Sequence, residues 1–107
     1  MYRNYNWINA GGVTGDMFKR KTTVVNKTGI HARPAANFVA RAKQFQSNIM
    51  VTNLSEDKGD TVNAKSIIEI LSLAMAEGSE VEISADGVDE EAAVNGLIVL
   101  INSGLGE

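Results

Sequence analysis

The spacing of apolar residues changes several times along this chain, and the order of the changes limits the folds available to it. Glu80–Ala85 alternates strictly between polar and apolar residues, which is typical of a strand with one buried face. Between residues 32 and 45, apolar residues instead recur at the three- and four-residue spacing of an amphipathic helix. From Phe18 onward the pattern predicts strand, helix, strand, strand, helix, strand and helix.

The expected strands cover residues 18–26, 47–53, 61–64 and 80–85, and the expected helices cover 32–45, 66–73 and the segment between Asp89 and Gly104. Ser66 stands three residues before Glu69, which is the arrangement of a capping box. Asp89 is placed to cap the last helix, and Gly104 is placed to end it.

This order of elements predicts an α+β fold. The first strand, helix and strand favour a parallel pair of strands joined by a right-handed crossover. The later hairpin, with a turn at Gly59–Asp60, and the fourth strand add antiparallel neighbours. We therefore expect an open-faced β-sandwich, β-α-β-β-α-β-α, whose four-stranded, largely antiparallel sheet is covered on one face by three helices.

Composition excludes several classes of function. A chain of 107 residues without cysteine forms no disulfide and uses no thiol chemistry, and one histidine excludes a histidine-rich metal site, so we expect no metal and no cofactor. The net charge of −3 argues against direct binding of nucleic acid. Gly96–Ile101, the longest apolar run, is too short to insert across a bilayer, and no secretory signal is recognisable. The simplest expectation is a cytoplasmic protein.

Residues 1–16 differ from the rest of the chain. They are rich in asparagine and glycine, contain both tyrosines and the tryptophan, and show no sustained period. We interpret them as an N-terminal extension, expected to be mobile, before a single domain over residues 17–107. A binding peptide that uses Tyr2, Tyr5 and Trp7 is the alternative.

The only histidine lies in a run that suits phosphoryl chemistry. Within Thr28–Ala36, Gly29 precedes His31 by two residues, and Arg33 and Pro34 follow it. Glycine permits a positive φ, and proline is preorganised for a first helical turn. A histidine at a helix N-terminus beside an arginine has both a nucleophilic ring and an anion site. A cap or surface role for this histidine is the alternative.

Two stretches and the C-terminus resemble one known family. They are Lys27–Ala36, Val62–Ile68 and the ending Gly104–Glu107. In these residues the chain is similar to HPr, the histidine-containing phosphocarrier protein of the sugar phosphotransferase system. The resemblance extends from about Met17 to the end of the chain.

The resemblance implies a role for several residues. His31 would accept a phosphoryl group from phosphoenolpyruvate-charged enzyme I and pass it to the IIA domain of a sugar permease, with Arg33 as the active-centre arginine. The protein would then be a carrier and not an enzyme, and the sequence has no nucleotide-binding loop. Further residues are expected at the helix N-terminus and in partner docking: Thr28, Ala32, Pro34, Ile67, Ile68 and Leu71.

Lys65–Ile67 resembles the regulatory serine site of HPr from low-GC Gram-positive bacteria, with Ser66 as its serine. There the serine is modified by HPr kinase/phosphorylase, and the product binds the catabolite control protein. Ser66 could equally be an ordinary helix cap. Where the family has glycine this chain has Glu69, whose carboxylate would repel a phosphoserine.

Two further interpretations stay open. The chain could be a regulatory HPr-like corepressor, although such relatives lack the histidine, or a phosphorelay protein that is not dedicated to sugar transport. Ile67, Ile68 and Leu71 could also belong to the core, and at least one of them is expected to face the sheet.

Overall fold

The computed structural model describes residues 17–56 and 60–106, and both the expected extension over residues 1–16 and Gly59 of the expected hairpin turn lie outside these ranges. The described elements, in chain order, are strand β2 (Phe18–Thr23), helix α1 (Ala32–Ala42), strands β3 (Asn48–Asn53) and β4 (Thr61–Asn63), helix α2 (Ile67–Ser72), strand β5 (Glu80–Asp86) and helix α3 (Glu90–Asn102). The expected order of strands and helices is therefore confirmed.

The four described strands form one sheet in the order β2-β5-β3-β4, and every neighbouring pair is antiparallel. The expected parallel pair is wrong, because β5 lies between β2 and β3. These two strands do run in the same direction, since each is antiparallel to β5. The connection through α1 therefore places β3 two positions away from β2 in the sheet, and β5 occupies the position between them.

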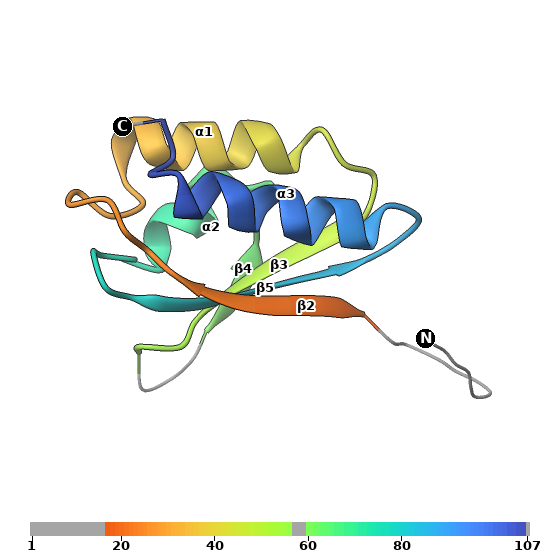
Figure 1. Ribbon diagram of the computed structural model, residues 1–107, viewed down its shortest axis with the longest axis horizontal. Coiled ribbons are helices and arrows are strands. Elements are labelled where there is room, and N and C mark those ends of the chain that lie inside the picture. Colours follow the sequence, from red (N-terminus) through yellow and green to blue (C-terminus); the bar gives the residue numbers. More distant parts are fainter. Residues whose placement is uncertain (1–16, 57–59, 107) are drawn as a thin grey trace.

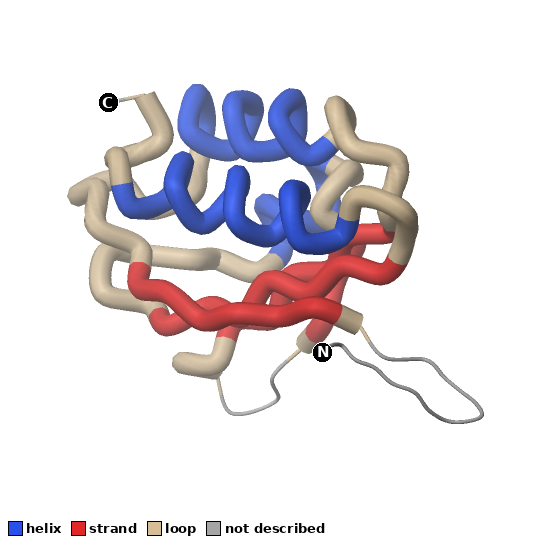
Figure 2. The backbone as a smooth tube through the Cα atoms, turned by 45° about the vertical axis from the view of Figure 1, so that its right-hand side comes forward, coloured by secondary structure: helices blue, strands red, loops and turns tan. Residues whose placement is uncertain are grey.

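All three described helices lie on one face of the sheet, and its other face is left open (Figure 1). Figure 2 shows the same two layers, with the strands below the helices. Helix α3 packs over β2 and β5, and α1 packs against α2 and α3. The open-faced α+β sandwich expected from the sequence is therefore the observed fold.

The core lies between the two layers. In β3 and β5 every second residue is buried, which puts three side chains of each strand against the helices. Helix α3 contributes its whole predicted stripe: Val94, Leu97, Ile98 and Ile101 are at most 2% exposed. Phe38 is a large, fully buried side chain that reaches the core from α1.

Two elements end three residues earlier than expected, and β4 and α2 end one residue earlier. Strand β2 stops at Thr23 because the chain turns at Asn26, whose carbonyl oxygen accepts a hydrogen bond from the Gly29 N–H at 3.0 Å. Helix α1 stops at Ala42, and Phe45 is only partly buried against the core. Apolar spacing alone continues across both points, so it overestimates the two lengths.

Candidate functional site

His31 is exposed and directly precedes helix α1, which begins at the end of the fold where α3 ends (Figure 1). It occupies the N-cap position with an extended backbone, φ −145° and ψ 158°, and its side chain makes no capping hydrogen bond. The backbone on either side, and not a capping hydrogen bond, therefore determines where the Cα and Cβ atoms of His31 lie. This geometry leaves the ring open to a protein partner.

The turn before His31 is packed tightly against the loop that follows α2. Gly29 has φ +70°, the positive value expected for glycine here. A Cβ at this position would overlap the Met75 carbonyl oxygen and lie 2.8 Å from Ala76 Cα. The next residue, Ile30, donates its N–H to that same Met75 oxygen at 2.9 Å. Only glycine fits this contact.

Ala32, directly after His31, also has a positive φ of +50°. For a residue with a Cβ, the left-handed region costs roughly 1–2 kcal/mol. Strained residues of this kind cluster at functional sites. Nothing in the sequence indicates this strain, because alanine is not a residue type that favours the conformation.

Arg33 and Pro34 complete the first turn of α1. Arg33 is exposed, whereas Pro34 is buried. Proline removes no helical hydrogen bond in a first turn, because those N–H groups have no intrahelical acceptor. The remaining N–H groups and the helix dipole favour an anion by about 0.3–1 kcal/mol, and an exposed guanidinium can add charge-assisted hydrogen bonds. The structure thus places His31 and Arg33 at one anion-favouring helix end.

An exposed apolar surface adjoins α1 on helix α2. Ile68 is 78% exposed, and Ile67 and Leu71 are each 39% exposed. Our expectation that one of these three faces the sheet is wrong: Ile70, 0% exposed, is the buried residue of α2. The helix is short, so a single position per turn reaches the core.

A shallow hollow of about 250 Å³ lies between α1 and α2. Ile67 lines it from α2, and the other lining residues belong to α1 or directly follow it: Ala36, Val39, Ala40 and Lys43. These α1 residues were not among the docking residues expected from the sequence, and the helical period places them on the side of α1 that contacts α2. We define the docking face as Ile67, Ile68 and Leu71 together with this hollow.

Ser66 caps α2, and its Oγ accepts a hydrogen bond from the Glu69 N–H at 3.3 Å. Of the two hydrogen bonds of the expected capping box, only this one forms. The Glu69 carboxylate does not return to the Ser66 N–H, which bonds to the Asn63 carbonyl oxygen at 3.2 Å. Glu69 Oε1 instead accepts from the Asn63 N–H at 3.0 Å. A fixed carboxylate therefore lies on the turn that carries Ser66.

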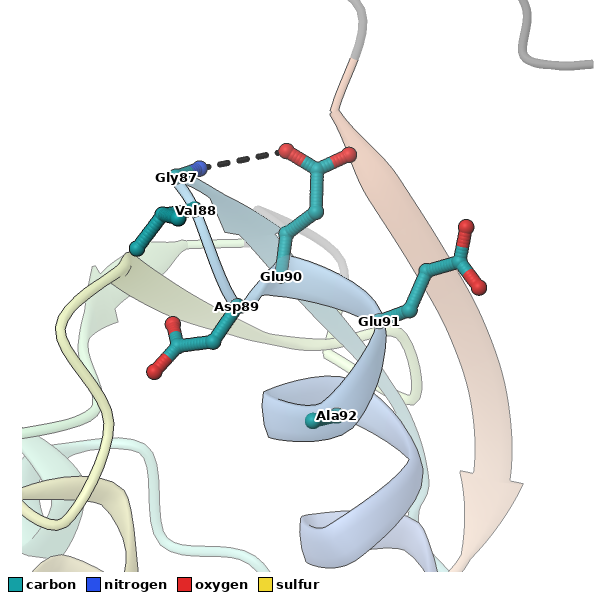
Figure 3. Close-up of a pocket in the computed structure, with 6 residues that line it drawn as sticks. All are labelled: Gly87, Val88, Asp89, Glu90, Glu91 and Ala92. Carbon is teal, nitrogen blue, oxygen red and sulfur yellow. Dashed lines mark hydrogen bonds between the residues drawn. The ribbon is translucent and has the colours of Figure 1, made fainter.

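Acidic residues surround an open hollow of about 610 Å³ at the start of α3, lined by Gly87–Ala92 (Figure 3). The carboxylates of Asp89, Glu90 and Glu91 point in different directions and do not converge. No cluster of three or more histidine, cysteine or acidic residues suited to a metal ion occurs in the described part of the chain.

Asp89 occupies the N-cap position of α3 but does not cap it, contrary to our expectation. Its carboxylate accepts the N–H groups of Gln46 and Ser47, each at 2.9 Å, and the Ser47 hydroxyl at 2.5 Å. These hydrogen bonds, above all the one from the Ser47 hydroxyl and then the one from the Gln46 N–H, stabilise the charged carboxylate. They lower the pKa of Asp89 from its usual 3.8. Asp89 therefore ties α3 to the loop before β3.

Among residues 17–56 and 60–106, no helix has both the length and the apolar character needed to cross a membrane.

Comparison with known proteins identifies the family. The family model for the PTS HPr component phosphorylation site matches residues 18–103. The phosphocarrier protein HPr of Haemophilus influenzae is 41% identical over 85 residues, which are 79% of this chain and 95% of that protein. The multiphosphoryl transfer protein of Vibrio cholerae is 48% identical over 84 residues, 78% of this chain but only 21% of that relative.

Solved structures agree with this match. The crystal structure of HPr-C-His from Thermoanaerobacter tengcongensis has 47% sequence identity and a TM-score of 0.76, and the comparison covers 84% of this chain and 97% of that one. The phosphocarrier protein HPr from Bacillus anthracis has 40% identity and a TM-score of 0.74, covering 79% and 96% of the two chains. The chain therefore belongs to the HPr family of phosphocarrier proteins of the phosphotransferase system.

Proposed function

We propose that His31 accepts a phosphoryl group from phosphoenolpyruvate-charged enzyme I and donates it to the IIA domains of sugar permeases. The observation that carries the proposal is the exposed imidazole at the N-terminus of α1, two residues before an exposed Arg33. As such a carrier the protein would act in the cytoplasm, as a covalent intermediate and not as an enzyme.

In the proposed transfer, a lone pair of the neutral His31 ring attacks phosphorus in the donor. A P–N bond forms to His31, the bond from phosphorus to the donor group breaks, and the donor retains that electron pair. The N-terminus of α1 and Arg33 then face a dianionic phosphoryl group, which both stabilise. The stabilisation should be modest, because a deeply bound phosphoryl group would not pass on to the next acceptor.

Docking would use the face defined above. Exposed isoleucine and leucine side chains beside a shallow apolar hollow are suited to a protein partner's apolar residues. Thr28 and Ala32 are exposed on either side of His31 and would border the partner at the point of transfer, whereas Pro34 is buried and would act only in starting α1.

The experiment combines the protein with enzyme I and phosphoenolpyruvate and measures intact mass. We expect one acid-labile phosphoryl group on the wild type and none on His31→Ala. Arg33→Ala serves as a second variant that keeps the acceptor and should slow the transfer. No modification of the wild type by an enzyme I that phosphorylates another HPr would refute the proposal.

We also propose that Ser66 is a regulatory phosphorylation site, as in relatives modified by HPr kinase/phosphorylase and read by the catabolite control protein. Ser66 is partly exposed and lies at the N-terminus of α2, where a phosphate is tolerated. The Glu69 carboxylate, held by the Asn63 N–H, opposes the added charge. Incubation with the kinase and ATP should modify the wild type slowly and Glu69→Gln faster, whereas Ser66→Ala should remain unmodified.

A further inference from the structure

Asn26 buries an amide side chain in the loop between β2 and α1, and the proposed transfer makes no direct use of it. The residue is 8% exposed, although its neighbours Val25 and Lys27 are exposed. Burying an amide costs free energy unless its polar atoms form hydrogen bonds. Its Nδ2 donates to the Gly29 carbonyl oxygen at 2.5 Å and lies 3.5 Å from Thr28 Oγ1.

This hydrogen bond holds one side of the peptide unit that enters the phosphoacceptor segment. The unit between Gly29 and Ile30 is planar, so its C=O and N–H groups move together. Asn26 binds the C=O of this unit, and the Met75 carbonyl oxygen accepts its N–H at 2.9 Å. The peptide plane is therefore fixed from both sides, one residue before His31.

His31 depends on this plane for its position. Its side chain makes no capping hydrogen bond, and the residue after it, Ala32, has a strained φ of +50°. If the incoming peptide could rotate, the chain could relieve that strain and carry the imidazole with it. A fixed plane at Gly29–Ile30 therefore limits the movement of the backbone that carries the ring.

We propose that Asn26 is a positioning residue for His31, holding the Gly29–Ile30 peptide so that the ring meets the incoming phosphoryl group in line. The proposal rests on the phosphotransfer function proposed above. A hydrogen bond of this kind contributes roughly one power of ten to an equilibrium. We therefore expect about a tenfold loss of transfer rate when the Nδ2 donor is removed.

The test compares Asn26→Asp with Asn53→Asp. Asn53 is a matched control, since it is 1% exposed and its Nδ2 also donates to a backbone carbonyl oxygen, that of Leu73, at 2.9 Å. Both changes keep the side-chain shape and remove the donor. With enzyme I as donor, at a temperature where both variants are folded, Asn26→Asp should lower the maximal rate about tenfold with little change in KM. Asn53→Asp should leave both constants near the wild-type values.

A local measurement separates this inference from the function itself. Amide hydrogen exchange at Gly29 and Ile30 should accelerate in Asn26→Asp and not in Asn53→Asp, whether or not any phosphoryl group is transferred. In the wild type, the Asn26 side-chain NH₂ should be protected from exchange, which needs no variant. Equal rate losses in the two variants, or an unprotected Asn26 NH₂, would overturn the assignment. A wild type that accepts no phosphoryl group would refute the proposed function, and the exchange data would still decide whether Asn26 holds the loop.

Discussion

Replacement of Gly29 by alanine should destabilise this protein far more than the same replacement at Gly78. Both glycines have positive φ, +70° and +88°. Placing alanine there costs roughly 1–2 kcal/mol, offset by about 0.4–1 kcal/mol from the less flexible unfolded chain. Apart from Gly78 itself and its two chain neighbours, no described residue has a heavy atom within 4 Å of the place that a Cβ on Gly78 would take, so Gly78→Ala should lose about 1.5 kcal/mol or less.

Gly29→Ala carries an additional steric cost. Its Cβ would overlap the Met75 carbonyl oxygen and approach Ala76 Cα to 2.8 Å, and both are backbone atoms that cannot rotate away. Overpacking of this kind costs about 1–3 kcal/mol. Added to the net backbone cost, the total loss in the free energy of unfolding should be about 1–4.5 kcal/mol.

Urea denaturation followed by far-UV circular dichroism measures both variants against the wild type. We expect the midpoint of Gly29→Ala to fall well below that of Gly78→Ala, with similar m-values. Phosphoryl transfer from enzyme I should also slow in Gly29→Ala alone, because relief of the overlap moves the segment that leads to His31. Equal midpoints for the two variants would refute the steric argument and leave only the backbone cost.

The remaining predictions concern the core, the docking face and pH. Ile70→Ala, at 0% exposure, should cost about 2–5 kcal/mol of stability in urea denaturation. Ile68→Ala, at 78% exposure, should change stability by less than about 0.5 kcal/mol yet raise the KM for phosphorylated enzyme I, and an unchanged KM would remove Ile68 from the docking face. Because folding lowers the pKa of Asp89, its stabilising effect is present above 3.8 and is lost as pH falls below that value. At neutral pH the wild type should therefore have a higher melting temperature than Asp89→Asn, and this difference should shrink in acid. A difference in melting temperature that does not change with pH would contradict this assignment.

Only some features of the docking face can be predicted from the local sequence pattern. The capping position of Ser66 and the short helix after it follow from neighbouring residues, and the structure has both. Which side of that helix is buried depends on where the sheet lies beneath it. Local pattern therefore did not indicate Ile70 as the core residue of α2.

In the phosphoacceptor segment, too, some features follow from the local sequence and others only from tertiary contacts. Gly29, His31, Arg33 and Pro34 are recognisable from their order along the chain, since each residue type has its own reason to stand at that position. The contact of Gly29 with Met75 joins two loops that are distant in sequence, and no local pattern indicates it. The strained φ of Ala32 likewise results from what surrounds it and not from the residue type.

By itself, the sequence determined the order of strands and helices, the buried stripe of α3 and the segment that carries His31, because periodicity, turn residues and caps act over a few neighbouring positions. Only the tertiary structure decided that β5 lies between β2 and β3, and that Asp89 binds the loop at Ser47 instead of capping α3. These features depend on pairing and packing between residues far apart in the chain. Such contacts become defined only when the whole sheet and its helices are assembled.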